Sequence, residues 1–191
     1  MNKYQKPLIQ GLILIGSLFL IWFLFQLINW SPLVAHKKVD LVSEKKIGDL
    51  LWEGIKQSEH VSEDAVVFGQ LDSLVGVICT SNGINRANVQ LHLIDKNEVN
   101  AFAMPGGHLI VYTGLFKKTE NSDQLCAVLA HEIAHIQLNH VIEKLSAEIG
   151  LTVLFSVLTN GGDAHMIHEI LRNLSSTKFS RELEKEADLK A

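Results

Sequence analysis

The chain has 191 residues, which is enough for one membrane segment and one modest soluble domain but not for two large domains. Hydrophobic residues make up 47% of the sequence, and part of them gather in the first thirty residues instead of spreading through a core. The formal net charge is −4 at pH 7 and no stripe rich in lysine and arginine is present, which argues against nucleic acid as a partner.

An uncharged segment of 21 residues runs from Leu8 to Ile28. At a rise of about 1.5 Å per residue, a helix of this length spans roughly 30 Å, which is the thickness of the hydrocarbon core of a bilayer. The alternative is a cleaved signal peptide, but the apolar region of a signal peptide is usually about 7–15 residues long. We therefore expect residues 1–30 to form a single-pass membrane anchor that contacts lipid through residues 8–28.

The positive charges on the two sides of this segment are nearly balanced. Lys3 and Lys6 precede it, and Lys37 and Lys38 follow it, so the positive-inside rule gives only a small preference. We expect the amino terminus inside and the following domain on the periplasmic or extracytoplasmic side.

A short linker, 31–42, leads into one folded domain, 43–191. Apolar residues recur at helical spacing from Ser43 to about Gln57, and the pattern repeats over 71–78 before Asn82-Gly83 ends it.

The two cysteines do not have the spacing of a metal site. We expect both to act as small buried hydrophobic residues, with a single disulfide bridge between them as the alternative. They are Cys79 and Cys126.

Three extended segments follow, over 89–94, 100–104 and 108–113, and the last two are joined by a turn at Pro105-Gly106-Gly107. We expect them to form a small antiparallel sheet.

A long helix is predicted from Ser122 to about Leu145, and shorter helices are predicted over 151–158, over 166–174 and from near Ser180. The domain is therefore expected to have an α+β fold that is mainly helical.

The long helix contains the sequence His131-Glu132-Ile133-Ala134-His135, an H-E-x-x-H motif. Residues four apart lie on one helix face, so both imidazoles can bind one Zn²⁺. Glu132 is about 100° round the helix from His131, where it can reach a water molecule at the metal and act as general base. An ordinary amphipathic helix with histidines in polar networks is the simpler interpretation of this motif.

A catalytic zinc ion needs a third protein ligand, and the acidic segment 180–188 offers candidates, although such a charge run is usually a solvated helix face. Glu184 and Asp188 are four residues apart, so one carboxylate can bind the metal while the other supports a ligand histidine. Glu182 and Glu186 form an equivalent pair on another face, and spacing alone leaves both pairs open.

The sequence resembles the HtpX/BepA/OMA-type zinc peptidases, which are gluzincins often tied to membranes. Three blocks carry the resemblance in the family's order, and together they span nearly half of the chain. They are residues 100–107 (NAFAMPGG) with 113–115 (TGL), residues 131–135 (HEIAH) with His140, and residues 180–188 (SRELEKEAD).

The resemblance implies a zinc-dependent endopeptidase that acts on protein or peptide substrates and holds one Zn²⁺ in a gluzincin-like domain. It implies that His131, His135 and Glu184 bind the metal and that Glu132 is the general base. It also implies that Asp188 supports a ligand histidine, His131, from behind.

The resemblance further implies that the segment 100–107 forms one edge of the active-site cleft. An exposed strand edge can take an extended substrate as an added strand, and glycine allows close backbone approach. A tight turn at residues 105–107 is the simpler interpretation, and both can hold together. The expected substrate-binding residues are Asn100, Ala101, Phe102, Ala103, Gly106 and Gly107.

Other histidines are expected to have minor roles. On one continuous helix, His140 lies half a turn away from His131, which places it at the surface or behind the ligands. His165 and His168 lie between the ligand segments; an oxyanion stabiliser and an inhibitory fourth ligand are conceivable roles, and we expect neither.

The chain ends at Ala191, whereas members of the resembled family usually continue, so we expect a fragment, a short variant or a truncated copy. The leading hypothesis is a membrane-anchored zinc endopeptidase in protein quality control at the membrane or cell envelope. The alternative is a catalytically silent zinc-binding scaffold or chaperone-like factor. An intramembrane protease is the weakest hypothesis, because only one spanning segment is predicted.

Overall fold

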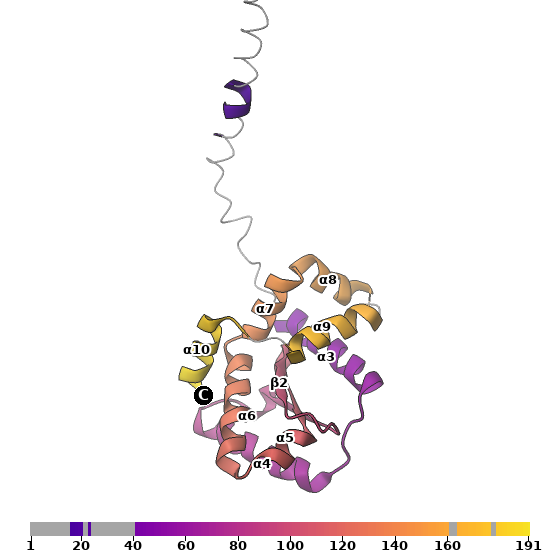
Figure 1. Ribbon diagram of the computed structural model, residues 1–191, viewed down its shortest axis with the longest axis vertical. Helices are drawn as coiled ribbons and strands as arrows, with labels where there is room; N and C mark the ends of the chain where they lie inside the picture. Colours follow the sequence, from indigo (N-terminus) through magenta and orange to yellow (C-terminus); the bar gives the residue numbers. More distant parts are fainter. Residues whose placement is uncertain (1–15, 21–22, 24–40, 161–163, 177–178) are drawn as a thin grey trace, which may run out of the picture. The chain divides into compact units, whose positions relative to one another are not determined.

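The computed structural model describes residues 16–20, 23, 41–160, 164–176 and 179–191 (Figure 1). The chain divides into two compact units, Met1–Lys38 and Val39–Ala191. Most of the predicted membrane segment, 8–28, and of the linker, 31–42, lies outside the described residues. Within the described part of the chain, no helix is both long enough and apolar enough to span a bilayer.

The second unit is mainly helical and contains one small sheet, which confirms the predicted α+β fold class (Figure 1). Its elements are α3 (Leu41–Ser58), α4 (Ala65–Ser81), η1 (Arg86–Asn88), β1 (Gln90–Ile94), β2 (Ala101–Met104), η2 (Pro105–Gly107), β3 (His108–Tyr112), α5 (Thr113–Lys118), α6 (Ser122–Gln137), α7 (His140–Glu148), α8 (Leu151–Asn160), α9 (Ala164–Ser176) and α10 (Arg181–Lys190).

The sheet is mixed, so the predicted antiparallel sheet is wrong in one pairing. The strand order is β1-β3-β2, with β2 antiparallel to β3 and β1 parallel to β3. The chain reverses between β1 and β2 but leaves the place between them for β3. An alternating pattern identifies a strand without identifying its neighbour, which is why the sequence did not reveal this arrangement. The consequence for the site is that β2 is an edge strand.

The turn between β2 and β3 depends on glycine. Gly106 and Gly107 have φ angles of 74° and 84°, which L-amino acids with side chains rarely adopt. A Cβ atom on Gly107 would lie 2.1 Å from the carbonyl oxygen of Asn88. We expected these glycines to allow a substrate backbone to approach closely. In the structure, the backbone that lies close to Gly107 is that of Asn88 in the same chain.

The sheet separates two hydrophobic cores. Leu109 and Val111 of β3 belong to a core completed by α4, α5 and α6. Ile110 and Tyr112 belong to the other core, which α3, α7, α8 and α9 complete. Successive side chains of a strand point to opposite faces, so the central strand is buried on both sides. The H-E-x-x-H helix, α6, contacts β2 on one side and α10 on another (Figure 1).

The long helix predicted from Ser122 to Leu145 is in fact two helices. α6 ends at Gln137 and α7 begins at His140, because Asn139 has a left-handed backbone with φ 59°. A left-handed residue cannot continue a right-handed helix, and asparagine tolerates this conformation better than most residues. The helical-wheel position predicted for His140 is therefore wrong.

Candidate metal centre

Three side chains with metal-binding atoms converge between α6 and α10. Nε2 of His131 lies 3.1 Å from Nε2 of His135 and 3.3 Å from Oε2 of Glu184. The ligand atoms of these three residues all lie within 4.8 Å of one another. His135 is buried, and His131 and Glu184 are partly exposed, so the group is open on one side. The structure thus brings together the two motif histidines and the glutamate predicted from the acidic segment.

This donor set fits zinc. Tetrahedral zinc with bonds of about 2.0–2.1 Å to nitrogen and oxygen requires ligand atoms roughly 3.3 Å apart. The two distances from His131 Nε2, 3.1 and 3.3 Å, are close to this value. Two histidines and one carboxylate also form a typical catalytic zinc set, which leaves one position for water.

Each of the two histidines has a hydrogen-bonding partner at Nδ1, which allows the tautomer that leaves Nε2 free to bind a metal. Nδ1 of His131 lies 3.0 Å from Oδ1 of Asp188, and Nδ1 of His135 lies 3.0 Å from Nδ1 of His140. A histidine that donates from Nδ1 presents the lone pair of Nε2 on the other side of the ring. With these tautomers, the two Nε2 atoms and the Glu184 carboxylate are three acceptors close together without a donor, which makes a cation site.

Glu132, next to His131 on α6, contacts the edge strand β2. The backbone N–H of Ala103 in β2 donates to Oε2 of Glu132 at 3.0 Å. Burial raises the pKa of Glu132 to about 7, although the positive potential of His131 and the Ala103 hydrogen bond act in the opposite direction. A carboxylate with a pKa near neutrality is well matched to proton transfer at physiological pH.

His135 is held by an aromatic ring that the sequence analysis did not single out. The ring of Phe179 stacks on His135 with centroids 3.8 Å apart and an interplanar angle of 14°. The ammonium of Lys144 lies 4.7 Å from the centroid of the same ring. Burial, with repulsion from His131, His140 and Lys144, lowers the pKa of His135 to about 3, so this ring is a neutral base in the folded protein.

The acidic residues of α10 have separate positions. Oε1 of Glu184 accepts a hydrogen bond from the backbone N–H of Phe179 at 3.1 Å, which fixes the carboxylate. Oε2 of Glu186 lies 3.3 Å from Nε2 of His140. Glu182 is exposed and is not part of the group. Glu184 and Asp188 thus face His131, whereas Glu186 faces His140.

His165 and His168 lie elsewhere. Both are on α9, are exposed, and line a hollow of about 570 Å³ whose other wall includes residues of α3. Neither belongs to the His131–His135–Glu184 group.

The residues predicted to bind substrate lie just before β2, on β2 and in the turn after it. Ala103 touches Glu132, while the Asn100 side chain donates to the carbonyl of Ser175 at 3.1 Å. Phe102 is buried against Tyr112 in an edge-to-face contact with ring centroids 5.9 Å apart. The N–H of Gly106 donates to Glu44 of α3 at 3.4 Å. The turn is thus fixed from behind by α3, and β2 faces the motif helix.

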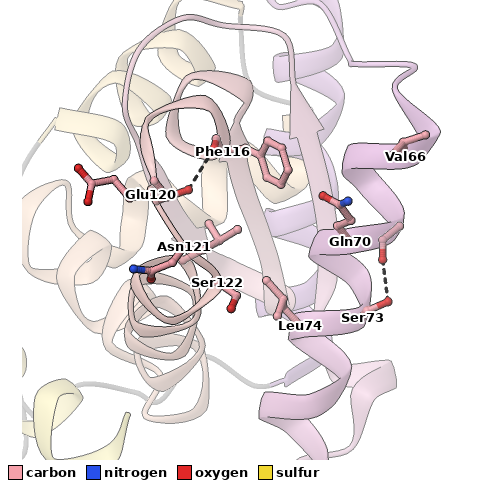
Figure 2. A pocket seen from close by; sticks show the side chains of 11 residues that line it. Val66, Gln70, Ser73, Leu74, Phe116, Glu120, Asn121 and Ser122 are labelled. Carbon is pink, nitrogen blue, oxygen red and sulfur yellow. Dashed lines mark hydrogen bonds between the residues drawn. The ribbon is translucent and has the colours of Figure 1, made fainter.

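A hollow of about 680 Å³ lies away from this group, between α4 and the chain that connects α5 to α6. Figure 2 shows side chains of its lining, among them Val66 and Gln70 of α4 and Phe116 of α5. The lining contains no histidine or cysteine, and its one carboxylate belongs to Glu120. A single carboxylate does not make a metal centre, so this hollow offers no counterpart to the group between α6 and α10.

Contacts of Lys144 and Phe179 were not expected from the sequence, whereas His140 lies behind a ligand histidine, one of the two positions expected for it. The signal for His140 was Asn139, because asparagine just after a helix often adopts the left-handed conformation that ends it. Lys144 and Phe179 carry no local signal, since each reaches the site through tertiary packing.

Comparison with known proteins agrees with this geometry. The chain is 29% identical to the mitochondrial metalloendopeptidase OMA1 of Homo sapiens over 209 residues, covering 98% of this chain and 40% of that protein. It is 32% identical to the mitochondrial metalloendopeptidase OMA1 of Schizosaccharomyces pombe over 113 residues, covering 58% of this chain and 34% of that one. It is 28% identical to the beta-barrel assembly-enhancing protease of Escherichia coli over 108 residues, covering 56% and 22%. Residues 66–191 match peptidase family M48, and the chain belongs to this family.

Proposed function

We propose that this chain is a zinc-dependent endopeptidase, with His131, His135 and Glu184 as metal ligands and Glu132 as general base. The observation that carries the proposal is the convergence of the three ligand atoms within 4.8 Å, next to the partly buried Glu132 on the same helix. The M48 match and the names of the relatives, which are metalloendopeptidases and proteases, support it. The chain spans 40% of the human relative, so its activity is inferred from its own residues.

If zinc is bound by these ligands, it would supply Lewis-acid activation of water and of the scissile carbonyl. Glu132 then accepts the proton of the attacking water and delivers it to the leaving amine. The Ala103 N–H holds one carboxylate oxygen of Glu132, at 3.0 Å, and leaves the other oxygen for the water. Asp188 orients His131 from behind, as the 3.0 Å contact at Nδ1 indicates.

Substrate binding is proposed along the edge of β2 that does not pair with β3. In an antiparallel pair, the main-chain N–H and C=O of alternate residues point away from the partner strand. The main-chain N–H of Ala103 points towards α6. The main-chain N–H and C=O of Ala101, two residues earlier, therefore point to the same side of β2. An extended peptide added along this edge would run beside Glu132 and the metal ligands.

We propose further that residues 1–30 anchor the chain in a membrane through residues 8–28, with the domain on the extracytoplasmic side. The uncharged 21-residue segment supports the anchor. A tethered peptidase would meet membrane and envelope proteins first, including damaged or misassembled ones, which suggests protein quality control.

The decisive experiment measures zinc content and casein cleavage of the full chain in detergent. We expect about one zinc per chain and cleavage that a chelator abolishes. Glu132→Gln should keep the zinc but lower kcat by at least about 100-fold, because general-base catalysis contributes that much. His131→Ala should lose both zinc and activity.

Glu182→Gln is the matched control, since this exposed carboxylate lies on α10 outside the metal group. It should behave like the unaltered chain. Stoichiometric zinc without cleavage of any substrate would instead favour the scaffold hypothesis.

A further inference from the structure

His140 is a buried polar residue that the proposed mechanism does not use. Its side chain is only 2% exposed, and it bridges two other groups. Nδ1 lies 3.0 Å from Nδ1 of His135, and Nε2 lies 3.3 Å from Oε2 of Glu186. The three side chains come from α6, α7 and α10. The left-handed Asn139 makes the contact possible, because it turns α7 so that its first residue faces the last turn of α6.

The hydrogen-bonding requirements of the three groups select one arrangement of protons. If Nε2 of His135 offers its lone pair to a metal, Nδ1 of the same ring carries the proton and donates it to His140. Nδ1 of His140 must then accept, which places the proton of His140 on Nε2. That proton points at Glu186, whose carboxylate can only accept. Each group therefore determines the tautomer of the next.

We propose that His140 is a positioning residue for the zinc ligand His135, and that Glu186 fixes the tautomer of His140. The inference rests on the zinc site proposed above and adds a support for its second histidine. The chain Glu186–His140–His135 is the counterpart of the single contact between Asp188 and His131. Each ligand histidine is thus linked to a carboxylate through its Nδ1 atom. His131 contacts Asp188 directly, and His135 is connected to Glu186 through the imidazole of His140.

Burial explains why the two supports differ. His131 is 25% exposed, so the Asp188 carboxylate can contact it and remain 71% exposed itself. His135 is 1% exposed, and a carboxylate placed directly against it would lose its hydration. A neutral imidazole can be buried there at lower cost, and it extends the link to Glu186, which is 62% exposed.

The test compares zinc affinity among variants of the full chain in detergent, by competition with a chromophoric chelator. His140→Leu fills the space but offers no acceptor, and should weaken zinc binding about 10- to 100-fold, as loss of groups behind a ligand typically does. His140→Asn places a carbonyl oxygen two bonds from Cβ, as Nδ1 is, and should bind zinc almost as tightly as the unaltered chain. A purely packing role would not distinguish the variants in this order.

Glu186 provides an independent variant that should not disturb folding, because its side chain is mostly exposed. Glu186→Gln should weaken zinc binding several-fold, since an amide can accept or donate and no longer fixes the His140 proton. Glu182→Gln, on the same helix and outside the relay, should bind zinc with unchanged affinity.

Two failures are distinguishable. If the unaltered chain binds no zinc, the proposed metal site is wrong and the relay with it. If the unaltered chain binds zinc and cleaves casein, but His140→Leu and Glu186→Gln retain full affinity, only the relay is overturned. Equal loss in His140→Leu and His140→Asn would also overturn it, because the acceptor atom would then be irrelevant.

Discussion

At the scale of single residues, the proposed general base Glu132 lies where its partial burial disfavours the ionised form of its carboxylate. Glu132 must be ionised to accept a proton, yet burial raises its pKa from 4.5 to about 7. The Ala103 N–H and the positive potential of His131 offset only part of this cost. Zinc beside the carboxylate would favour the ionised form further, because a cation lowers the pKa of a neighbouring acid. The zinc-free and zinc-bound proteins should therefore differ in their response to pH.

We predict that the zinc-free protein loses stability as the pH rises from about 4.5 to about 7, because of Glu132. An acid with a raised folded pKa binds more protons in the folded state over this range, so its contribution falls with rising pH. Glu132→Gln should remove this loss and should be more stable than the unaltered chain above pH 7. After allowance for partial solvation, we expect a difference of about 1–2 kcal/mol.

The measurement is urea unfolding of both proteins with chelator present, near pH 5 and near pH 8. His135 is common to both proteins, so its titration cancels in the comparison. A stability difference that is the same at both pH values would mean that the Glu132 charge is not responsible.

At the scale of elements, the three strands and most of the helices could be predicted from periodicity, but the short helix α5, the break after α6 and the strand pairings could not. The apolar pattern continues from Leu129 through Ile136 to Val141, so it gave no sign that α6 ends at Gln137. The break depends on one dihedral angle at Asn139. Likewise, the parallel pairing of β1 with β3 depends on which strand occupies the centre of the sheet, and tertiary packing decides that.

Asn139 allows a direct test of how this break supports the site. We predict that Asn139→Ala lowers the free energy of unfolding by about 1 kcal/mol, because alanine lacks the short polar side chain that lets asparagine adopt the left-handed conformation at φ 59°. Asn139→Gly should be close to neutral, because glycine adopts this conformation readily. Urea unfolding of the zinc-bound chain measures both effects. Equal destabilisation by alanine and glycine would point to a role for the asparagine side chain instead of its backbone.

At the scale of the whole domain, the candidate site was more predictable than its surroundings. Helical spacing related His131 to His135 and limited the third ligand to two acidic pairs, and only the family resemblance selected Glu184, which the structure places beside the two histidines. The groups behind them come from α7 and from the segment before α10, and only the complete fold brings these together.

A second pair of histidines, the partly buried His92 and the buried His108, joins the sheet to α3. His92 of β1 stacks on Trp52 of α3, with ring centroids 3.8 Å apart, and its Nε2 lies 2.8 Å from Nδ1 of His108. Nε2 of His108 in turn lies 3.2 Å from Oδ1 of Asp49 in α3. Burial, with repulsion from His108 and Lys56, lowers the pKa of His92 to about 4.

This contact should make the whole domain sensitive to acid. A histidine with a lowered folded pKa stabilises the fold above its unfolded pKa of 6.5, and that stability is lost as the pH falls towards 4. His92→Gln should therefore reduce the drop in unfolding free energy between about pH 7 and pH 4.5, by roughly 1–2 kcal/mol after allowance for partial exposure. Urea unfolding with chelator present measures the drop, and His60→Gln, at an exposed position, is the matched control. If His92→Gln and His60→Gln showed the same drop as the unaltered chain, protonation of His92 would not limit the acid stability of the domain, and the carboxylates paired in the fold would become the explanation to test.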